Sequence, residues 1–141
     1  MLALAIEEPA FPPPPGTFVA GMAPRILLAE DDPDMRRLVA SILRRDGYQV
    51  IAVSNGVSML RRMPEDFDAI VSDIQMPDLT ALEVLEALRC REIATPVVLM
   101  TAYGSELARI EASALGAFAV LDKPLDWDAL RTTVRQAVLI G

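Results

Sequence analysis

The sequence contains no histidine, a single cysteine (Cys90) and a single lysine (Lys123) among its 141 residues. Without histidine there is no imidazole for acid–base catalysis, for a Ser-His-Asp or Cys-His nucleophile, or for metal binding. One cysteine excludes an internal disulfide and a zinc site built from several thiolates. A reactive site in this chain must therefore use carboxylates, hydroxyls, amides, arginine or the one lysine.

Positive charge is scarce as well, because 13 basic residues face 20 acidic ones and the net charge is −7. So acidic a chain has no surplus of cations to displace the counterions of nucleic acid, and it is not attracted to an anionic membrane surface. The sequence has no apolar stretch of about 18 residues, as a transmembrane helix requires, and the apolar start lacks the basic residues of a signal peptide. We therefore expect a cytoplasmic protein that neither binds nucleic acid directly nor inserts into a membrane.

Proline is unevenly distributed, with five of the 11 prolines in the first 16 residues and four of them consecutive. Consecutive prolines favour polyproline II and cannot donate hydrogen bonds to a helix or sheet. We therefore treat residues 1–24 as a Pro-rich, flexible N-terminal extension and residues 25–141 as one domain of ordinary size.

From residue 25 onward, short apolar runs alternate with stretches of helical periodicity. Strands are expected at 26–29, 48–53, 68–72, 96–100 and 117–121, and helices at 33–46, 56–62, 80–91, 105–116 and 127–139. Asp32, Asn55 and Asp126 are placed to cap the first, second and last helix. Runs without polar alternation indicate strands buried on both faces. The pattern predicts an α/β protein with a doubly wound, flavodoxin-like (βα)5 fold, whose five parallel strands follow the order 2-1-3-4-5.

Charged and hydroxyl side chains follow four of these strands. They are Glu30, Asp31 and Asp32 after the first strand, Asp73 after the third, Thr101 after the fourth and Lys123 after the fifth. Taken singly, each has a plain structural explanation as a helix cap, a turn residue or a solvated surface group. In a parallel sheet, however, the strand ends share one edge, and two carboxylates about 4 Å apart repel by about 4 kcal/mol at an effective dielectric constant of about 20. That repulsion is relieved if a divalent cation binds, and an all-oxygen site suits Mg²⁺, or if the carboxylates take up protons.

Carboxylates beside a hydroxyl and a lysine suit phosphoryl transfer onto a carboxylate. The metal and the lysine would neutralise the oxygens of the transferred group, and the hydroxyl would bind one of them. The phosphate-binding loops GxxxxGK(S/T) and GxGxxG are both missing. We therefore do not expect a site built around a nucleotide.

Five short segments stand in order at the strand ends and after them. They are Ile26–Asp32 (ILLAEDD), Asp73–Asp78 (DIQMPD), Leu82-Glu83, Thr101-Ala102 and Lys123-Pro124. Together they resemble the response regulator receiver domain of two-component signalling, and the resemblance covers residues 25–141. It implies a phosphoacceptor that takes a phosphoryl group from a sensor histidine kinase or a phosphotransfer protein.

The resemblance also implies a role for each matching residue. Asp73 is the phosphoacceptor, with Thr101 as the switch hydroxyl and Lys123 as the partner of the phosphoryl oxygen. Mg²⁺ is held by Glu30, Asp31, Asp73 and the backbone carbonyl of Gln75, and the Lys123–Pro124 peptide bond is cis. The protein is then a signalling phosphoacceptor that assists its own phosphorylation and dephosphorylation, and not an enzyme in the ordinary sense.

Two positions depart from the family pattern. Ala81 stands where a glycine is usual, so the turn there is expected to differ. Val120 stands three residues before the lysine, where an aromatic ring is usual, which alters how activation is relayed. Phe118 is expected on the same side of the strand as Val120, where its ring could take over part of that role.

The chain stops after the fifth helix, so we expect output through contacts with an unidentified protein or through onward phosphotransfer. The expected contact surface lies around 103–109 and Val120. One alternative is an interaction module that works without phosphorylation. A phosphatase with an aspartate nucleophile would need a further acid and a cap domain, and neither is evident in the sequence.

Overall fold

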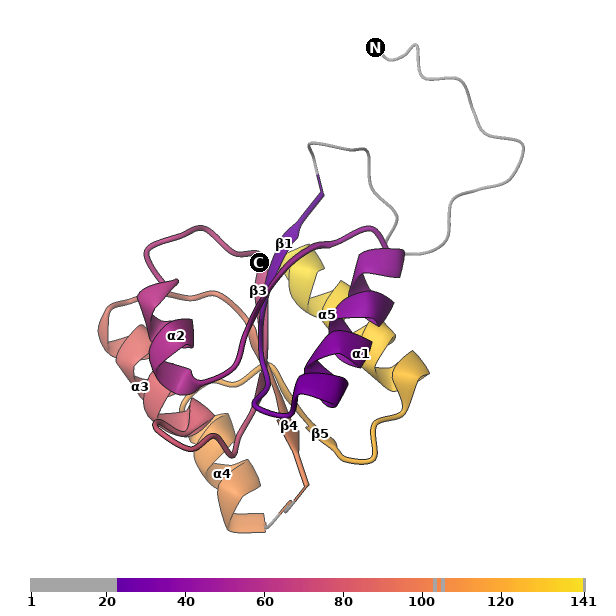
Figure 1. The fold of residues 1–141 in the computed structure, drawn as a ribbon. Helices are drawn as coiled ribbons and strands as arrows, with labels where there is room; N and C mark the ends of the chain where they lie inside the picture. The colour runs from indigo at the N-terminus through magenta and orange to yellow at the C-terminus, as the bar shows by residue number, and fades with distance from the viewer. Residues whose placement is uncertain (1–22, 103, 105, 141) are drawn as a thin grey trace, which may run out of the picture.

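The computed structural model describes residues 23–102, 104 and 106–140, which form five strand–helix units (Figure 1). The strands are β1 (Arg25–Ala29), β2 (Gln49–Val53), β3 (Ala69–Asp73), β4 (Val97–Thr101) and β5 (Ala119–Asp122). The helices are α1 (Pro33–Arg45), α2 (Gly56–Arg61), α3 (Ala81–Cys90), α4 (Glu106–Ala114) and α5 (Trp127–Ile140). Residues 1–22 of the expected extension lie outside the described residues.

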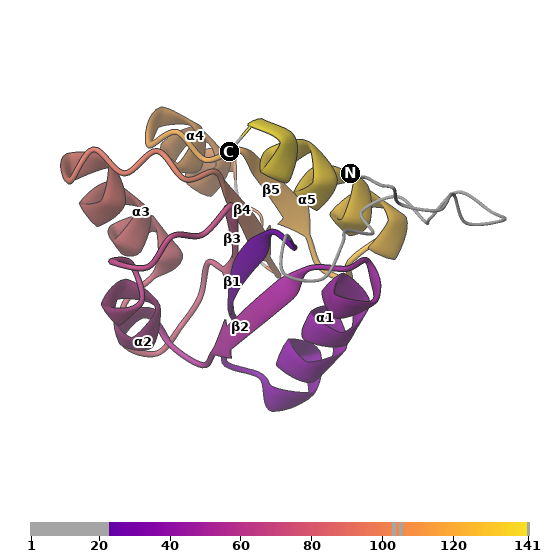
Figure 2. The ribbon, with the colours of Figure 1, turned by 90° about the horizontal axis from the view of Figure 1, so that it is seen from above.

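The strands form one parallel sheet in the order β2-β1-β3-β4-β5 (Figure 2), as predicted. β1 pairs with both β2 and β3, so the chain reverses its winding direction at β1. Because all strands run the same way, their carboxyl ends lie along a single edge of the sheet. That edge, between β1 and β3, is where doubly wound sheets bind ligands.

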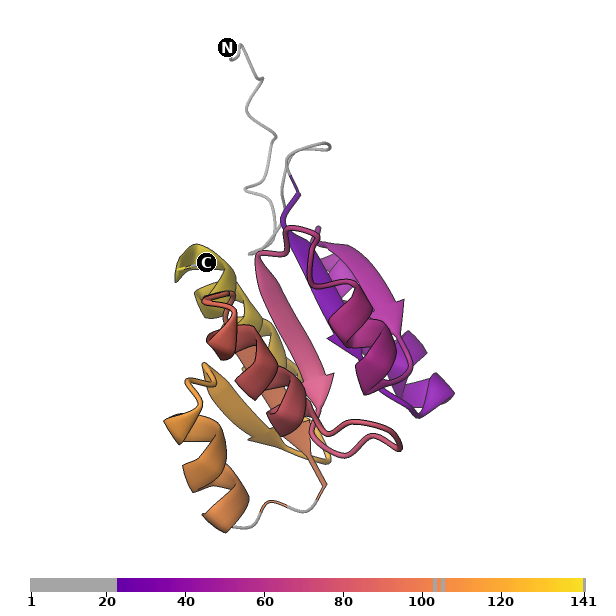
Figure 3. The same cartoon turned by 90° about the vertical axis from the view of Figure 1, so that its left-hand side faces the viewer.

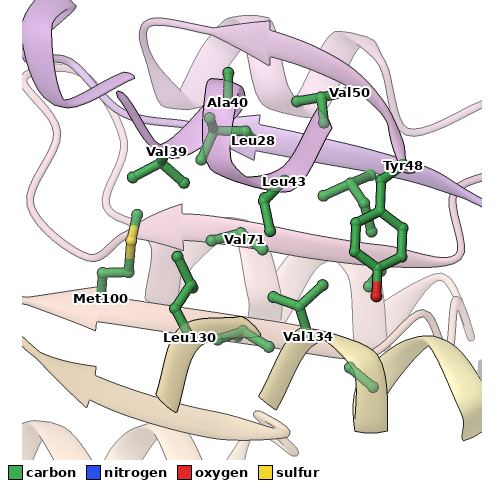
Figure 4. Close-up of a cluster of buried hydrophobic side chains, with 14 residues drawn as sticks. Leu28, Val39, Ala40, Leu43, Tyr48, Val50, Val71, Met100, Leu130 and Val134 are labelled. Atoms are coloured by element: carbon green, nitrogen blue, oxygen red, sulfur yellow. The ribbon is translucent and has the colours of Figure 1, made fainter. Parts of the chain in front are cut away.

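Helices cover the sheet on both faces, with α1 and α5 on one side and α2, α3 and α4 on the other (Figures 1 and 3). The first face holds a core in which Leu28 and Met100 from the sheet contact side chains of α1 and α5, including Leu43 and Leu130 (Figure 4). Leu27, the neighbour of Leu28, lies in a second core beneath α3. Successive residues of one strand thus enter opposite cores, which explains the uninterrupted apolar runs in the sequence.

The helix starts follow the predicted capping residues. Asp32 accepts hydrogen bonds from the backbone N–H of Asp34 (2.9 Å) and Met35 (3.4 Å) at the start of α1. Asn55 caps α2 in the same way, and Asp126 accepts from the first turn of α5. These caps satisfy N–H groups that the helix itself leaves unpaired.

The start of α3 shows two features that local sequence patterns did not predict. Thr80 and Glu83 form a capping box, in which each side chain accepts from the other residue's N–H. Ala81 is the first residue of the helix, and its N–H donates to the carbonyl of Ile74 (3.0 Å). Since Ala81 adopts no positive φ, the position does not require glycine.

The expectation for Phe118 was wrong. Phe118 packs with Leu121 against the core beneath α1 and α5, whereas Val120 packs against the opposite core. β5 begins only at Ala119, so the alternation of sides along a strand does not extend to Phe118. Its ring therefore cannot take the place of a ring at Val120.

Other boundaries agree to within one or two residues, although the expected helix start at Ser105 lies outside the described residues. The edge strands β2 and β5 are only partly buried, unlike the central three. The Lys123–Pro124 peptide bond is cis, as the resemblance implied. In the part of the chain that the structure describes, no helix is long and apolar enough to cross a membrane.

Candidate functional site

The sheet brings charged and hydroxyl side chains from four strand ends to one edge. Asp73 and Thr101 are the last residues of β3 and β4, Glu30 and Asp31 directly follow β1, and Lys123 directly follows β5. The strands run in parallel and their pairing is in register, so residues far apart in the sequence become neighbours. This edge is the candidate site.

Three carboxylates gather there. Glu30, Asp31 and Asp73, here called the carboxylate cluster, each place an oxygen within 4.8 Å of the others. Glu30 is fully buried and Asp73 is 7% exposed, whereas Asp31 faces solvent. The cluster is therefore open to water on the side of Asp31.

Lys123 lies between the two buried carboxylates. Its Nζ donates to Glu30 Oε1 (2.7 Å) and to Asp73 Oδ2 (3.1 Å). Burial alone would lower the pKa of Lys123, but the hydrogen bonds to Glu30 and then Asp73 outweigh it and raise that pKa. The ammonium is accordingly held in its charged form beside the carboxylate of Asp73.

The surroundings of Glu30 act on its pKa in both directions. Burial raises its pKa most, and the charge of Asp73 adds to this, while the hydrogen bonds from Lys123 and from the N–H of Asp32 lower it. The net effect is a raised pKa for a carboxyl group that lies next to two others. One lysine against three carboxylates leaves the site with excess negative charge when all are ionised.

That excess charge and the ligand atoms present fit a divalent cation. The donors are all oxygens, which suits Mg²⁺ far better than it suits zinc or copper. The open side at Asp31 leaves room for the water ligands that Mg²⁺ retains. The chemistry of the donor set is therefore consistent with the predicted metal.

The residues after Asp73 also contact its carboxylate. The N–H of Gln75 donates to Asp73 Oδ1 (3.2 Å), so each oxygen of this side chain accepts a hydrogen bond. The N–H of Ile74 donates to the carbonyl of Met100 (2.8 Å) and extends the pairing with β4 by one residue. The carbonyl of Gln75 stays a predicted metal ligand.

Thr101 occupies the corresponding place on the neighbouring strand. It is 2% exposed, and it lies opposite Asp122 in the pairing of β4 with β5. Its carbonyl accepts the N–H of Lys123 (2.8 Å), which links the predicted switch hydroxyl and the lysine through the backbone.

Two arginines near the site make contacts that the sequence did not predict, although Arg109 belongs to the contact surface expected at 103–109. Arg36, one turn into α1, donates from Nη1 to the carbonyl of Glu30 (2.9 Å) and steadies the turn after β1. Arg109 of α4 pairs with Asp122 at the end of β5 and also reaches the carbonyl of Val120 (3.5 Å). Both sit at helical positions where an exposed arginine is ordinary, so the sequence offered no signal for these contacts.

Comparison with known proteins places the chain in a family with the same arrangement. The family described as response regulator receiver domain matches residues 26–135. The chain is 33% identical over 115 residues to the regulatory protein AtoC of Escherichia coli (strain K12), covering 81% of this chain and 25% of that protein. It is 44% identical over 103 residues to the transcriptional activator protein PfeR of Pseudomonas aeruginosa, covering 72% and 33%. The chain thus spans a quarter to a third of these two relatives.

Solved structures give the same picture. The receiver domain of the Francisella response regulator 1452 matches with a TM-score of 0.79 at 28% identity, over 83% of this chain and 98% of that chain. The chemotaxis response regulator CheY4 of Vibrio cholerae matches with a TM-score of 0.75 at 29% identity, over 82% and 98%. With the sheet order, the matched segment and the cluster at the strand ends in agreement, the chain belongs to the response regulator receiver domain family of two-component signalling.

Proposed function

We propose that Asp73 accepts a phosphoryl group from the phosphohistidine of a sensor histidine kinase or a phosphotransfer protein. The observation that carries this proposal is the setting of the Asp73 carboxylate, which is bound by Lys123 and by the N–H of Gln75 next to Glu30 and Asp31. These 141 residues contain no histidine, so the donor imidazole must lie outside them.

In the transfer, an oxygen of Asp73 forms a bond to phosphorus as the phosphorus–nitrogen bond of the donor breaks. The electron pair of that bond leaves with the imidazole. Lys123 holds its positive charge beside the incoming oxygens, and Thr101 supplies a hydroxyl from the next strand. Fixed charges and dipoles of this kind stabilise the charge of the transferred group without having to reorganise.

Mg²⁺ would be held by the carboxylates of Glu30, Asp31 and Asp73 and by the carbonyl of Gln75. When bound, it supplies positive charge to the phosphoryl oxygens. In the absence of the metal, Lys123 is the only ammonium available to offset the three carboxylates.

For the output, we propose that residues 25–141 form the receiver unit and signal through contacts with another protein. Two relatives are named regulatory protein and transcriptional activator, but this chain matches only a part of each. The proposed contact surface includes Arg109 and Val120, while Tyr103, also expected there, lies outside the described residues.

The test is incubation of the protein with acetyl phosphate and Mg²⁺, followed by intact-mass measurement. We expect the mass of one phosphoryl group on the wild-type protein, none on Asp73→Asn, and an unchanged gain on Asp128→Asn, which alters an exposed acid on α5. Omitting Mg²⁺ should abolish the labelling. A wild-type protein that gains no phosphoryl group, or an Asp73→Asn variant that still does, would leave the interaction module as the better description.

A further inference from the structure

The loop between β3 and α3, residues 74–80, is tied to α2 by the carboxylate of Asp78. Asp78 Oδ1 accepts the N–H of Gly56 (2.9 Å), and Oδ2 accepts that of Val57 (3.0 Å). Asp78 Oδ1 also accepts the N–H of Leu79 (2.7 Å) within the loop. Asp78 thus completes the cap of a helix that begins 22 residues earlier in the chain.

A steric feature fixes the same contact independently. A Cβ atom at Gly56 would lie 2.6 Å from the carbonyl oxygen of Leu79 and 2.7 Å from its Cβ. No other residue would allow the loop to lie so close to the first turn of α2 without a shift. The hydrogen bonds of Asp78 and the missing side chain at Gly56 therefore hold the loop in one place.

The other anchors of the loop are on β4 and at the start of α3. The N–H of Ile74 donates to Met100, and the carbonyl of Ile74 accepts the N–H of Ala81 (3.0 Å). Gln75 lies between these anchors and Asp78, and its N–H donates to Asp73 Oδ1. A peptide held on both sides has little freedom to rotate, so its N–H and the neighbouring carbonyl keep their directions.

The contact is electrostatically well matched. A carboxylate at a helix N-terminus interacts favourably with the helix dipole, and hydrogen bonds to an ionised group are stronger than those between neutral groups. The hydrogen bond from Val57, followed by those from Leu79 and Gly56, lowers the pKa of Asp78. An exposed aspartate is already ionised at neutral pH, and these hydrogen bonds keep Asp78 charged to lower pH.

We propose that Asp78 is a positioning residue for the reaction at Asp73: by holding the loop on α2, it sets the direction of the Gln75 backbone toward Asp73 and toward Mg²⁺. This inference rests on the proposed function, because it concerns the metal and the carboxylate that function needs. Supporting residues behind metal ligands commonly change metal affinity by about 10-fold or more when they are altered.

The experiment measures Mg²⁺ affinity by NMR titration of the backbone amides in wild type, Asp78→Ala, Asp78→Asn and Gly56→Ala. We expect Asp78→Ala and Gly56→Ala to weaken Mg²⁺ binding about 10-fold, and Asp78→Asn, which keeps one acceptor oxygen, to weaken it less. In the metal-free protein, the amide of Gln75 should exchange with solvent faster in Asp78→Ala than in wild type.

Two controls separate positioning from general effects. Asp128→Asn makes the same charge change on α5, and Val134→Ala lowers stability in the core away from the loop. Both should bind Mg²⁺ as wild type does. Wild-type affinity in Asp78→Ala and in Gly56→Ala overturns the inference, whereas a wild-type protein that acetyl phosphate leaves unlabelled overturns the proposed function instead. If Asp78→Ala does not fold, Gly56→Ala and Asp78→Asn decide.

Discussion

At the scale of single residues, the positive charge of Lys123 only partly neutralises the negative charge of the carboxylate cluster. The single ammonium is shared by Glu30 and Asp73, and Asp31 receives none of it in the described contacts. A metal ion that binds the cluster therefore relieves repulsion that Lys123 leaves in place. Because such an ion binds the folded protein alone, it also raises the stability of the fold.

This gives a prediction for Asp31. Millimolar Mg²⁺ should raise the melting temperature of the wild-type protein, and Asp31→Ala should lose most of that gain because it removes the exposed carboxylate of the cluster. Asp32→Ala is the matched control, since Asp32 caps α1 and its loss should lower the melting temperature equally with and without Mg²⁺. Differential scanning fluorimetry measures both effects. A wild-type melting temperature indifferent to Mg²⁺ would contradict the metal assignment.

The raised pKa of Glu30 gives a second prediction. Between pH 4.5, the ordinary pKa of this group, and its higher value in the folded protein, the folded state binds a proton that the unfolded state does not. The metal-free protein should therefore lose this stabilising contribution as the pH rises through the folded-state pKa. Urea unfolding at a series of pH values should show that slope in wild type and a weaker one in Glu30→Gln.

Glu65 provides a control of opposite sign. Its hydrogen bonds to Arg25 and Arg62 lower its pKa below 4.5, so its contribution is present above pH 4.5 and lost as the pH falls through the folded-state value. Glu65→Gln should leave the slope above pH 4.5 unchanged. Identical pH profiles for Glu30→Gln and wild type would remove the electrostatic argument for Glu30.

The site was predictable where side chains directly follow buried strands. Glu30, Asp31, Asp73 and Lys123 were expected to meet because parallel strands end on one edge, and the structure brings them together. Asp78 was not identified as the cap of α2, because its partners lie 21 and 22 residues away and only the folded chain brings them near. Contacts of that kind depend on packing, which local sequence patterns do not encode.

At the scale of elements, helices with a polar cap and an apolar stripe were placed well. The boundaries of β5 were less accurate, because Phe118 continues the apolar run while its ring belongs to the opposite core from that of Val120. An apolar run signals burial without saying which side is buried. Where a core lies on each face of one sheet, the backbone conformation at the start of the strand decides which core a side chain enters.

α4 has the fewest buried residues of the five helices in the described part of the chain. Ala112 is its one fully buried residue among those described, and Leu107 and Ile110 are 75% and 60% exposed. The ion pair of Arg109 with Asp122 links α4 to the end of β5, and we expect it to help hold the helix in place.

Arg109→Gln should accordingly loosen α4. We expect its amides to exchange about threefold faster, which corresponds to about 0.7 kcal/mol for a partly exposed ion pair. Hydrogen–deuterium exchange with mass spectrometry measures this, and Arg37→Gln, which breaks an exposed pair on α1, should leave α4 unchanged. Equal exchange of α4 in wild type and Arg109→Gln would show that the pair does not hold the helix.

At the scale of the whole molecule, the phosphoryl group proposed for Asp73 would have to act on distant surfaces through the sheet. A phosphoryl group adds about −1.5 to −2 charges, and Thr101 and Lys123 are the neighbours able to respond. Thr101 precedes α4 in the chain and Lys123 precedes α5, so a phosphoryl group at this edge would have a route to both helices. Because Val120 offers no ring to change position, we expect a smaller response than an aromatic residue would give.

This response can be measured with beryllofluoride, which mimics the phosphoryl group. Backbone NMR shifts should appear in the carboxylate cluster and across 101–123, and they should be absent in Asp73→Asn. Shifts confined to the residues after β1 and β3 would contradict a relay through β4 and β5. In that case another face would carry the signal.

The single lysine has a consequence for covalent chemistry. A reagent or enzyme that acylates amines finds only one side-chain target in this chain, Lys123, besides the terminal amine. That amine is protonated, engaged by two carboxylates and 16% exposed, so it should react slowly. Once acylated, it would lose the positive charge that faces Asp73, and one modification would silence the site. Because the other basic side chains are arginines, the chain has one lysine to acylate, and that lysine lies in the proposed phosphoacceptor site.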